Sequence, residues 1–351
     1  MSTNLDPAVI ERDLQEMWRS AGAESPEQPV VRAALGTFVM VDAGDAVAVA
    51  GTLGRVTEVL PCRALVVQRV AADAGVPPLA AMTSMHCRTA GRGQQVCCEQ
   101  VTLRVRADAL EGLAAAILGL LLPDLPTLLY VPGDSDLAGP VFEKVAKHVE
   151  RLIVDSASFA DPEPQLAALD AWRLRGLEVA DLNWARLDVW RELFASFFDA
   201  PPFDADLGAL SSFEIEHDGR SRAQALLAAG WLVSRLGWRF EADRGFVAGT
   251  RPIALRLATV PGPAAAPGLR RLAARVAGGR RYVVERDPDH PSLVVARIET
   301  AGACPVPQRS APPVADTDTE LVRILQRPPG NPAHAAALAA VSSVVAASGA
   351  A

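Results

Sequence analysis

The sequence lacks the short motifs that mark the common enzyme classes. It contains no Gly-x-Ser-x-Gly nucleophile elbow, no Gly-x-x-x-x-Gly-Lys phosphate loop and no His-Glu-x-x-His zinc helix. The nearest dinucleotide-like string, GTLGRV from Gly51, follows a helical stretch, whereas that fingerprint must follow a strand. Because no motif supports catalysis, we expect a protein that is not an enzyme and that needs no cofactor.

The basic excess of a nucleic-acid binder is also missing. Lys and Arg number 34 against 41 Asp and Glu, a formal net charge of −7. The longest aliphatic run, Leu113–Leu122, is far shorter than the roughly 20 residues that cross a bilayer. The amino terminus has no basic segment followed by an apolar run. We therefore expect a cytoplasmic protein that binds neither nucleic acid nor membrane.

Cysteine is scarce and unevenly placed. The five cysteines are Cys62, Cys87, Cys97, Cys98 and Cys304. An odd number at irregular spacing is not the framework of a secreted disulfide-rich domain. In the cytoplasm we expect Cys87 and Cys97 to be free thiols that only oxidation would join.

Three of the cysteines fall in a predicted β-hairpin, MTSMHCRTAGRGQQVCCEQVTLRVR, whose turn centres on Arg92. This turn places Cys87 opposite Cys97, within the distance that a disulfide spans. Three interpretations stay open: plain buried thiols, a redox-responsive Cys87–Cys97 pair, or a metal site that adds His86 and Cys98. Neighbouring strand residues point to opposite faces, so Cys97 and Cys98 cannot easily bind one tetrahedral ion, which disfavours the metal site.

Strands and helices alternate over most of the first 200 residues. The segments VVRAALGTFVMV, RALVVQRV, TLLYVPG and RLIVDSAS have the composition of strands, and helical segments such as 113–122 and 141–150 lie between several of them. This alternation predicts an α/β domain with a largely parallel sheet covered on both faces. The hairpin is then an insertion in that domain.

The pattern changes after residue 207, where strand-like segments come in adjacent pairs as in antiparallel sheets. Two helices are expected here, SRAQALLAAGWLVSRLG and GLRRLAARVAGG. The second helix begins an arginine run that either forms a solvated helix face or holds an anionic partner. The run consists of Arg270, Arg271, Arg275, Arg280 and Arg281.

These patterns predict three successive regions. Residues 1–200 form the α/β domain and end in an aromatic helix, and residues 207–300 form an α+β domain. Residues 301–351 form a linker, which includes the Pro-rich PVPQRSAPPVADTD, and a helical tail.

Polar side chains follow two of the predicted parallel strands. Gly133, Asp134 and Ser135 come after TLLYV, and Asp155 and Ser156 come after RLIV. Ligands of open α/β sheets bind outside the carboxyl ends of strands, so these residues are a candidate ligand site. Asp and Ser at such positions also cap the helices that follow, which is the simpler interpretation.

The segment DLNWARLDVWRELFASFFD, residues 181–199, concentrates two tryptophans and three phenylalanines in a chain that is 5% aromatic. Leu187, Trp190, Phe194 and Phe197 follow helical spacing along one face. Other apolar residues spread over the flanks, so we expect a helix that packs between domains, binds another protein, or does both.

The chain resembles the glucose-6-phosphate dehydrogenase assembly proteins of the OpcA family. The resemblance rests on LNWARLDVWRELFASFFD, RLIVDSASF, PDLPTLLYVPGD, QVCCEQVTLR and GWLVSRLGW, which occur in the order typical of the family. It implies a protein that promotes assembly or activity of glucose-6-phosphate dehydrogenase without being a catalyst. The positions most typical of the family are Trp184, Arg186, Leu187, Trp190 and Arg191.

The resemblance therefore implies a non-catalytic assembly factor or allosteric activator of glucose-6-phosphate dehydrogenase in the oxidative pentose phosphate pathway. The alternative is a phosphosugar-binding sensor that uses the strand-end site near Gly133 and Asp155. A metal- or thiol-dependent enzyme built on the hairpin is the interpretation that the residues support least.

Overall fold

The chain divides into two compact units that alternate along the sequence. Unit 1 comprises residues 1–158, 175–180 and 321–330, and unit 2 comprises residues 159–174, 181–320 and 331–351. The expected successive domains 1–200, 207–300 and 301–351 cut the sequence differently, and their boundaries stay a prediction. The computed structural model describes residues 5–24, 30–41, 46–71, 75, 77–90, 94–108, 110, 112–134, 137, 139–199, 201–262, 267–300, 308–311 and 316–349.

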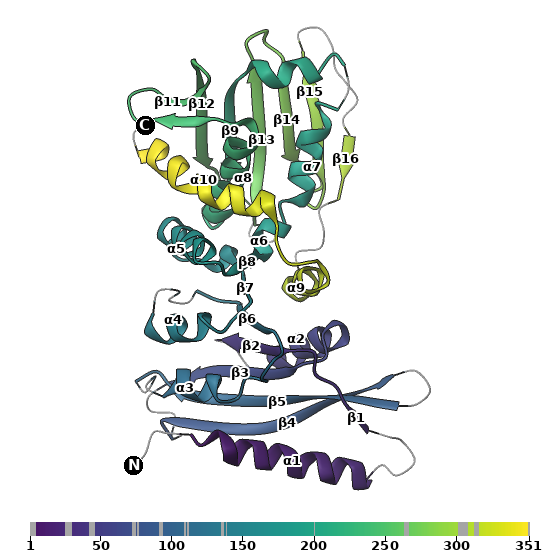
Figure 1. The fold of residues 1–351 in the computed structure, drawn as a ribbon. Coiled ribbons are helices and arrows are strands. Elements are labelled where there is room, and N and C mark those ends of the chain that lie inside the picture. Colours follow the sequence, from purple (N-terminus) through teal and green to yellow (C-terminus); the bar gives the residue numbers. More distant parts are fainter. Residues whose placement is uncertain are drawn as a thin grey trace. The chain divides into compact units, whose positions relative to one another are not determined.

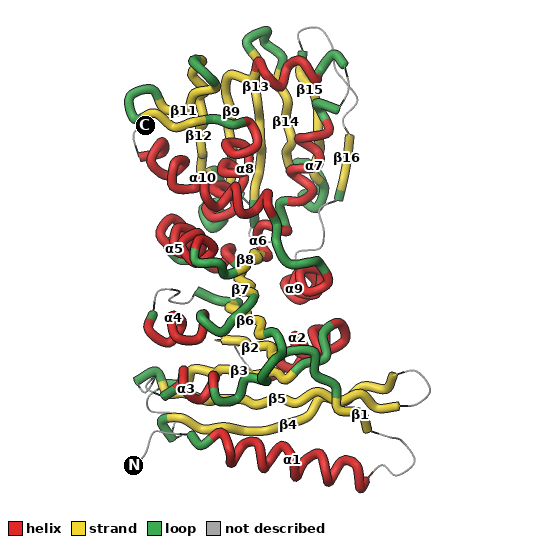
Figure 2. Tube along the Cα trace, viewed as in Figure 1, coloured by secondary structure: helices red, strands yellow, loops and turns green. Residues whose placement is uncertain are grey.

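A largely parallel sheet forms the centre of unit 1 (Figures 1 and 2). Its order is β1-β5-β3-β2-β6-β7-β8, and β4 pairs antiparallel with β5 as the inserted hairpin. This arrangement confirms the predicted α/β fold class. The strands are β1 (Val30–Arg32), β2 (Thr37–Val41), β3 (Arg63–Val70), β4 (Leu79–Ala90), β5 (Gln94–Arg106), β6 (Thr127–Val131), β7 (Arg151–Val154) and β8 (Glu178–Asp181).

The central strands of this sheet are continuous apolar runs because both of their faces are buried. Phe38 and Val39 of β2, which point to opposite faces, are both fully buried. The helices whose residues lie in unit 1 are α1 (Pro7–Glu24), α2 (Ala46–Val59), α3 (Leu113–Leu118) and α4 (Pro140–Ala146). Among the described residues, no helix is both long and apolar enough to cross a membrane.

A buried charge network joins helix α1 to the sheet of unit 1. The Arg63 side chain is 2% exposed and that of Glu99 3%, and Arg63 Nε lies 2.8 Å from Glu99 Oε2. Glu11 of α1 accepts from the same guanidinium, and Trp18 of α1 donates its indole N–H to Glu99 at 2.6 Å. Arg32 approaches Glu99 to 2.7 Å. The polar groups that this helix buries are therefore paired, as burial requires.

Unit 2 is built on a second, mixed sheet of order β10-β11-β12-β9-β13-β14-β15-β16. Among the described strand pairs of this sheet, only β9 and β12 are parallel, which confirms the α+β class. Its strands are β9 (Leu210–His217), β10 (Arg239–Glu241), β11 (Gly245–Ala248), β12 (Arg251–Thr259), β13 (Leu269–Val276), β14 (Arg281–Arg286), β15 (Val294–Glu299) and β16 (Gln308–Ser310).

The helices of unit 2 pack around α8, most of which is buried. A Cβ atom added to Gly230 of α8 would lie 2.3 Å from the carbonyl oxygen of Ala337 in α10, so only glycine permits this close approach. The helices are α5 (Pro162–Leu174), α6 (Leu182–Ala185), α7 (Asp188–Ser196), α8 (Arg222–Leu236) and α10 (Pro332–Gly349), and α9 (Thr317–Gln326) has residues in both units.

The expectation of a helix at GLRRLAARVAGG is wrong, because this segment contains strand β13. Leu, Arg and Ala favour helices, but pairing with β9 and β14 overrides that local preference. The arginines therefore do not line a helix. Arg271 lies on the outer side of the sheet, 2.8 Å from Glu214 and 3.3 Å from Glu216, and Arg281 lies 3.4 Å from Glu299.

The buried network predicts a large effect of removing its cation. Arg63→Met leaves Glu99 buried with fewer partners and should destabilise unit 1 by about 3 kcal/mol. Hydrogen exchange of β3 and β5 amides in increasing urea measures this. Arg19→Met, which removes an exposed pair with Glu16, is the control and should cost under about 1 kcal/mol. Equal effects of the two substitutions would contradict the role given to Arg63.

Candidate functional site

The aromatic segment 181–199 forms two short helices instead of the single helix expected. Helix α6 is capped by Asp181, whose carboxylate accepts from the Asn183 N–H at 2.8 Å. At the end of α6 the Leu187 N–H bonds to the Trp184 carbonyl three residues back, at 3.1 Å. This tightened turn interrupts the i to i−4 pattern, and helix α7 starts anew at Asp188.

The family-typical apolar residues of this segment are buried within unit 2. Trp184 is 3% exposed, Leu187 0% and Trp190 2%. These three side chains therefore belong to the core of unit 2. Arg186 is half-buried, and its guanidinium lies 3.5 Å from the Thr317 hydroxyl.

Arg191 stacks on the buried Trp184 ring. Its guanidinium carbon lies 3.7 Å from the ring centroid, close enough for a cation–π contact. The same guanidinium pairs with Asp188 one turn earlier on α7. The ring centroids of Trp184 and of His334 on α10 lie 5.2 Å apart. One tryptophan thus links α6, α7 and α10.

The phenylalanines of the segment attach α7 to the sheet and to α8. The Phe194 ring centroid lies 5.8 Å from that of Phe213 on β9 and 6.1 Å from that of Trp231 on α8. The Phe198 ring lies 4.7 Å from Tyr282 on β14. Burial of Tyr282, together with its hydrogen bond to Asp206, raises the pKa of its hydroxyl to about 12.

A groove of about 540 Å³ lies between α7 and α8 above this aromatic layer. Its apolar lining includes Phe198, Leu207 and Trp231, and charged lining residues include Glu192 and Arg235. Leu207 is 40% exposed, so part of the apolar lining faces solvent. We did not predict this groove from the sequence, although Trp231 and Arg235 stand four residues apart on a predicted helix and so share one of its faces.

The predicted strand-end residues lie at neighbouring strands, because β6 and β7 are paired and parallel. Asp155 is 7% exposed and Ser156 1%. Asp155 Oδ1 accepts from the Ala157 N–H at 3.2 Å and so caps the short helix Ser156–Ser158. Gly133 and Asp134 follow β6, whereas Ser135 lies outside the described residues.

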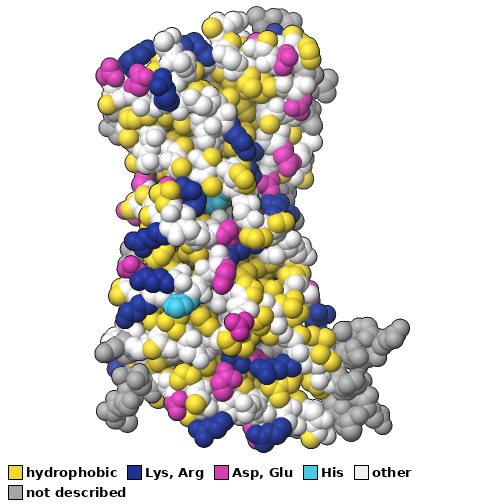
Figure 3. Space-filling view, viewed as in Figure 1, with side chains coloured by type: hydrophobic (Ala, Val, Ile, Leu, Met, Phe, Trp, Pro, Cys, Tyr) yellow, Lys and Arg dark blue, Asp and Glu magenta, His cyan; other side chains and the backbone are white. Residues whose placement is uncertain are grey.

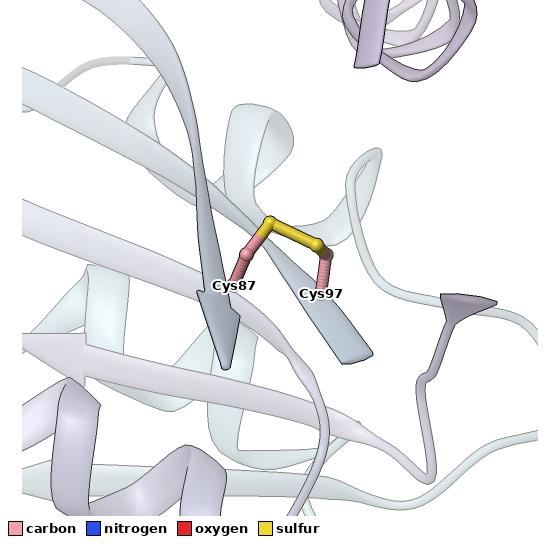
Figure 4. The surroundings of a disulfide bond; sticks show 2 residues. All are labelled: Cys87 and Cys97. Atoms are coloured by element: carbon pink, nitrogen blue, oxygen red, sulfur yellow. A yellow bond between two sulfur atoms is a disulfide. The ribbon is translucent and has the colours of Figure 1, made fainter. Parts of the chain in front are cut away.

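The hairpin register is as predicted, with Cys87 directly opposite Cys97. Free thiols were expected at this pair, but the two sulfur atoms form a disulfide, with the Cα atoms 4.0 Å apart (Figure 4). The turn residues 91–93, with Arg92, lie outside the described part. The remaining described cysteines, Cys62 and Cys98, are buried, and burial raises the pKa of both thiols.

Metal binding finds no support at the hairpin. The His86 ring meets the Gln100 side chain. Within the ranges described by the structure, no three His, Cys, Asp or Glu side chains come together as metal ligands.

The Trp184 stack predicts that Arg191 stabilises the fold of unit 2. Arg191→Ala removes the cation–π contact and the Asp188 pair and should lower the unfolding free energy by about 1–2 kcal/mol. Glu192→Ala, its exposed neighbour, is the matched control and should change stability by under about 0.5 kcal/mol. Hydrogen exchange of α7 amides in increasing urea measures both. An Arg191→Ala chain as stable as the control would contradict the structural role of the stack.

Two family models match the chain in sequence order. The model of the glucose-6-phosphate dehydrogenase subunit N-terminal domain matches residues 55–171, and that of the corresponding C-terminal domain matches residues 177–338. Together they cover well over half of the chain, including the aromatic segment and the groove.

Cyanobacterial proteins show the same relationship over part of their length. Two proteins named "Putative OxPP cycle protein OpcA" are similar to this chain. The one from Synechocystis sp. is 35% identical over 181 residues, and the one from Nostoc punctiforme is 36% identical over 182 residues. Each match covers 51% of this chain and only 38% of the relative's own length.

Among solved structures, a 3-ketoreductase from Actinomadura kijaniata is 14% identical with a TM-score of 0.46, covering 91% of this chain and 96% of that one. An aldose-aldose oxidoreductase from Caulobacter crescentus is 12% identical with a TM-score of 0.43, covering 90% and 97%. Likeness at this level carries no information about activity.

The identity of the chain thus rests on the two domain models, which match consecutive segments of it, and on the cyanobacterial relatives. The chain belongs to the OpcA family of glucose-6-phosphate dehydrogenase assembly subunits.

Proposed function

We propose that this chain is a non-catalytic partner of glucose-6-phosphate dehydrogenase that promotes its assembly or activity in the oxidative pentose phosphate pathway. The observation that carries the proposal is the match of both dehydrogenase-subunit domain models. On this proposal the protein acts in the cytoplasm. It raises activity by binding the assembled, active state of the dehydrogenase more tightly than the inactive state, because only differential affinity shifts such an equilibrium.

The groove between α7 and α8 is the surface that we assign to the dehydrogenase. Its aromatic lining and charged side chains are the combination in which interface binding energy concentrates. The family-typical residues support the groove indirectly. Trp184, Leu187 and Trp190 are buried, and Arg191 both lines the groove and stacks on Trp184. On this assignment, α7 and α8 present one side to the partner and pack the other side into the core.

The groove assignment predicts different effects at two exposed leucines. Leu207→Asp places a charge in the groove and should weaken co-elution and activation of the dehydrogenase from the same cell by about tenfold or more. Leu174→Asp, which changes a 72% exposed leucine on α5 outside the groove, is the matched control and should leave both unchanged.

The two measurements are gel filtration of the mixture and dehydrogenase turnover with and without the chain. If both variants lose co-elution and activation to the same extent, or neither loses them, the groove is not the interface. If the unaltered chain neither co-elutes with the dehydrogenase nor raises its activity, the proposed function itself is wrong.

A phosphosugar-binding sensor is the runner-up, and the strand-end geometry supports it less. Asp155 and Ser156 are buried, and Asp155 already caps a short helix. A phosphate placed between the ends of β6 and β7 would also meet the carboxylates of Asp134 and Asp155, which repel it. Saturable binding of glucose 6-phosphate to the chain alone, lost in Ser156→Ala, would favour the sensor.

The Cys87–Cys97 pair is the proposed redox element of the assembly function. The two residues stand opposite each other in the hairpin, so oxidation and reduction close and open a cross-strand link without moving the strands apart. We expect oxidant to lower activation of the dehydrogenase and reductant to restore it. Cys87→Ser should remove this response, measured as activation under matched oxidant. Equal sensitivity of Cys87→Ser and the unaltered chain would leave these cysteines as packing residues.

A further inference from the structure

Unit 1 contains a cavity of about 650 Å³ above its sheet, between helices α3 and α4. Val41, Val67 and Val131, at or near the carboxyl ends of β2, β3 and β6, line it. In the sheet order β2 stands between β3 and β6, because the chain runs from β2 to β3 and β5 on one side and then returns to β6 on the other. Such a switch point, at the carboxyl ends of parallel strands, is where open α/β sheets bind ligands. The volume also falls within the range of small-molecule sites.

The cavity walls are apolar, and the charged lining residues that the structure describes are all of one sign. Aliphatic side chains of α3, including Leu113 and Ile117, face Phe142 and Val145 of α4. Among the lining residues that the structure describes, none is acidic. The ionisable lining residues are Arg69, Lys144, Lys147 and His148. In Figure 3, dark-blue cationic side chains and a cyan histidine gather over the position of α4. The electrostatic potential at this cavity therefore favours an anion.

Lysine itself is informative here because the whole chain contains only Lys144 and Lys147. Every other strongly basic side chain is an arginine. The two lysines stand three residues apart, so they share one face at the end of α4, and both line the cavity. A lysine stem covers apolar surface while its ammonium stays at the water boundary, which suits the mouth of a cavity with an apolar interior.

We propose that this cavity binds an amphipathic anion, with an apolar body between α3 and α4 and a carboxylate or phosphate at Lys144 and Lys147. A sugar phosphate does not fit, because its hydroxyl groups would lose water without gaining partners against aliphatic walls. A dinucleotide does not fit either. The sequence between β2 and α2 is DAGD, with one glycine and two aspartates where pyrophosphate binding needs a glycine-rich turn.

The two lysines make the proposal directly testable with the full chain. Reductive ¹³C-methylation gives NMR signals from Lys144, Lys147 and the amino terminus, and sodium dodecanoate is added below its micellar concentration. We expect saturable shifts of the two lysine signals and none of the terminal signal. Dodecyltrimethylammonium, with the same chain and opposite charge, should not displace dodecanoate. An acidic protein that binds chains non-specifically would favour the cation instead, so this comparison separates the two cases.

Two pairs of variants locate the ligand. Ala115→Trp fills the cavity from an exposed position on α3 and should abolish dodecanoate binding, whereas Ala339→Trp, at an exposed position on α10, should not. Replacing both lysines by glutamine should weaken binding about tenfold or more by calorimetry. Arg239→Gln, an exposed cation outside the cavity, is its control and should bind normally.

The same titration with naphthyl phosphate in place of dodecanoate shows which anion binds more tightly, an aromatic phosphate or an acyl carboxylate. The proposal is overturned if neither anion moves the lysine signals, if Ala115→Trp and Ala339→Trp bind equally, or if the cation competes as well as the anion. These measurements use the chain without the dehydrogenase, so their outcome is independent of the proposed assembly function.

Discussion

The stacking of Arg191 on the buried Trp184 ring is the contact on which the arrangement of unit 2 depends. It fixes α7 against α6, and through His334 it also holds α10, which packs on α8. Helix α8 is largely buried, and it contacts α10 and the sheet strand β9. A planar guanidinium suits this place because it can stack and pair with a carboxylate at once.

This contact explains how a motif can be typical of a family of assembly proteins while most of it is buried. Trp184, Leu187 and Trp190 are buried in the core, and the groove between α7 and α8 is the surface that we assign to the partner protein. Arg191 takes part in both, since it stacks on the buried ring and lines the groove. In unit 1 the packing contact and the candidate site are separate. The Arg63–Glu99 pair holds α1 on the sheet, and the cavity lies between α3 and α4.

The alternation of strand-like and helical segments was enough to predict the parallel sheet of unit 1. The position of the hairpin turn predicted the pairing of Cys87 with Cys97. Local preference misled the prediction at Leu269–Val276, where helix-forming residues pair as a strand because two neighbouring strands offer partners. The break between α6 and α7 depends on a single tightened turn, which periodicity cannot reveal. The groove and the cavity both arise where separate helices meet, which periodicity does not show. Lys144 and Lys147 are the only lysines in the sequence, and this could have marked the cavity.

The central claim is that the groove beside α7 and α8 receives glucose-6-phosphate dehydrogenase. Hydrogen exchange of this chain with and without the dehydrogenase tests it most directly. The short helix Asp204–Ala209 carries Leu207 at the groove and is largely exposed, so its amides should exchange freely in the chain alone. The account predicts slower exchange there, and at the exposed end of α7, when the dehydrogenase is present. A stable complex that leaves this segment unprotected and slows exchange elsewhere would contradict it.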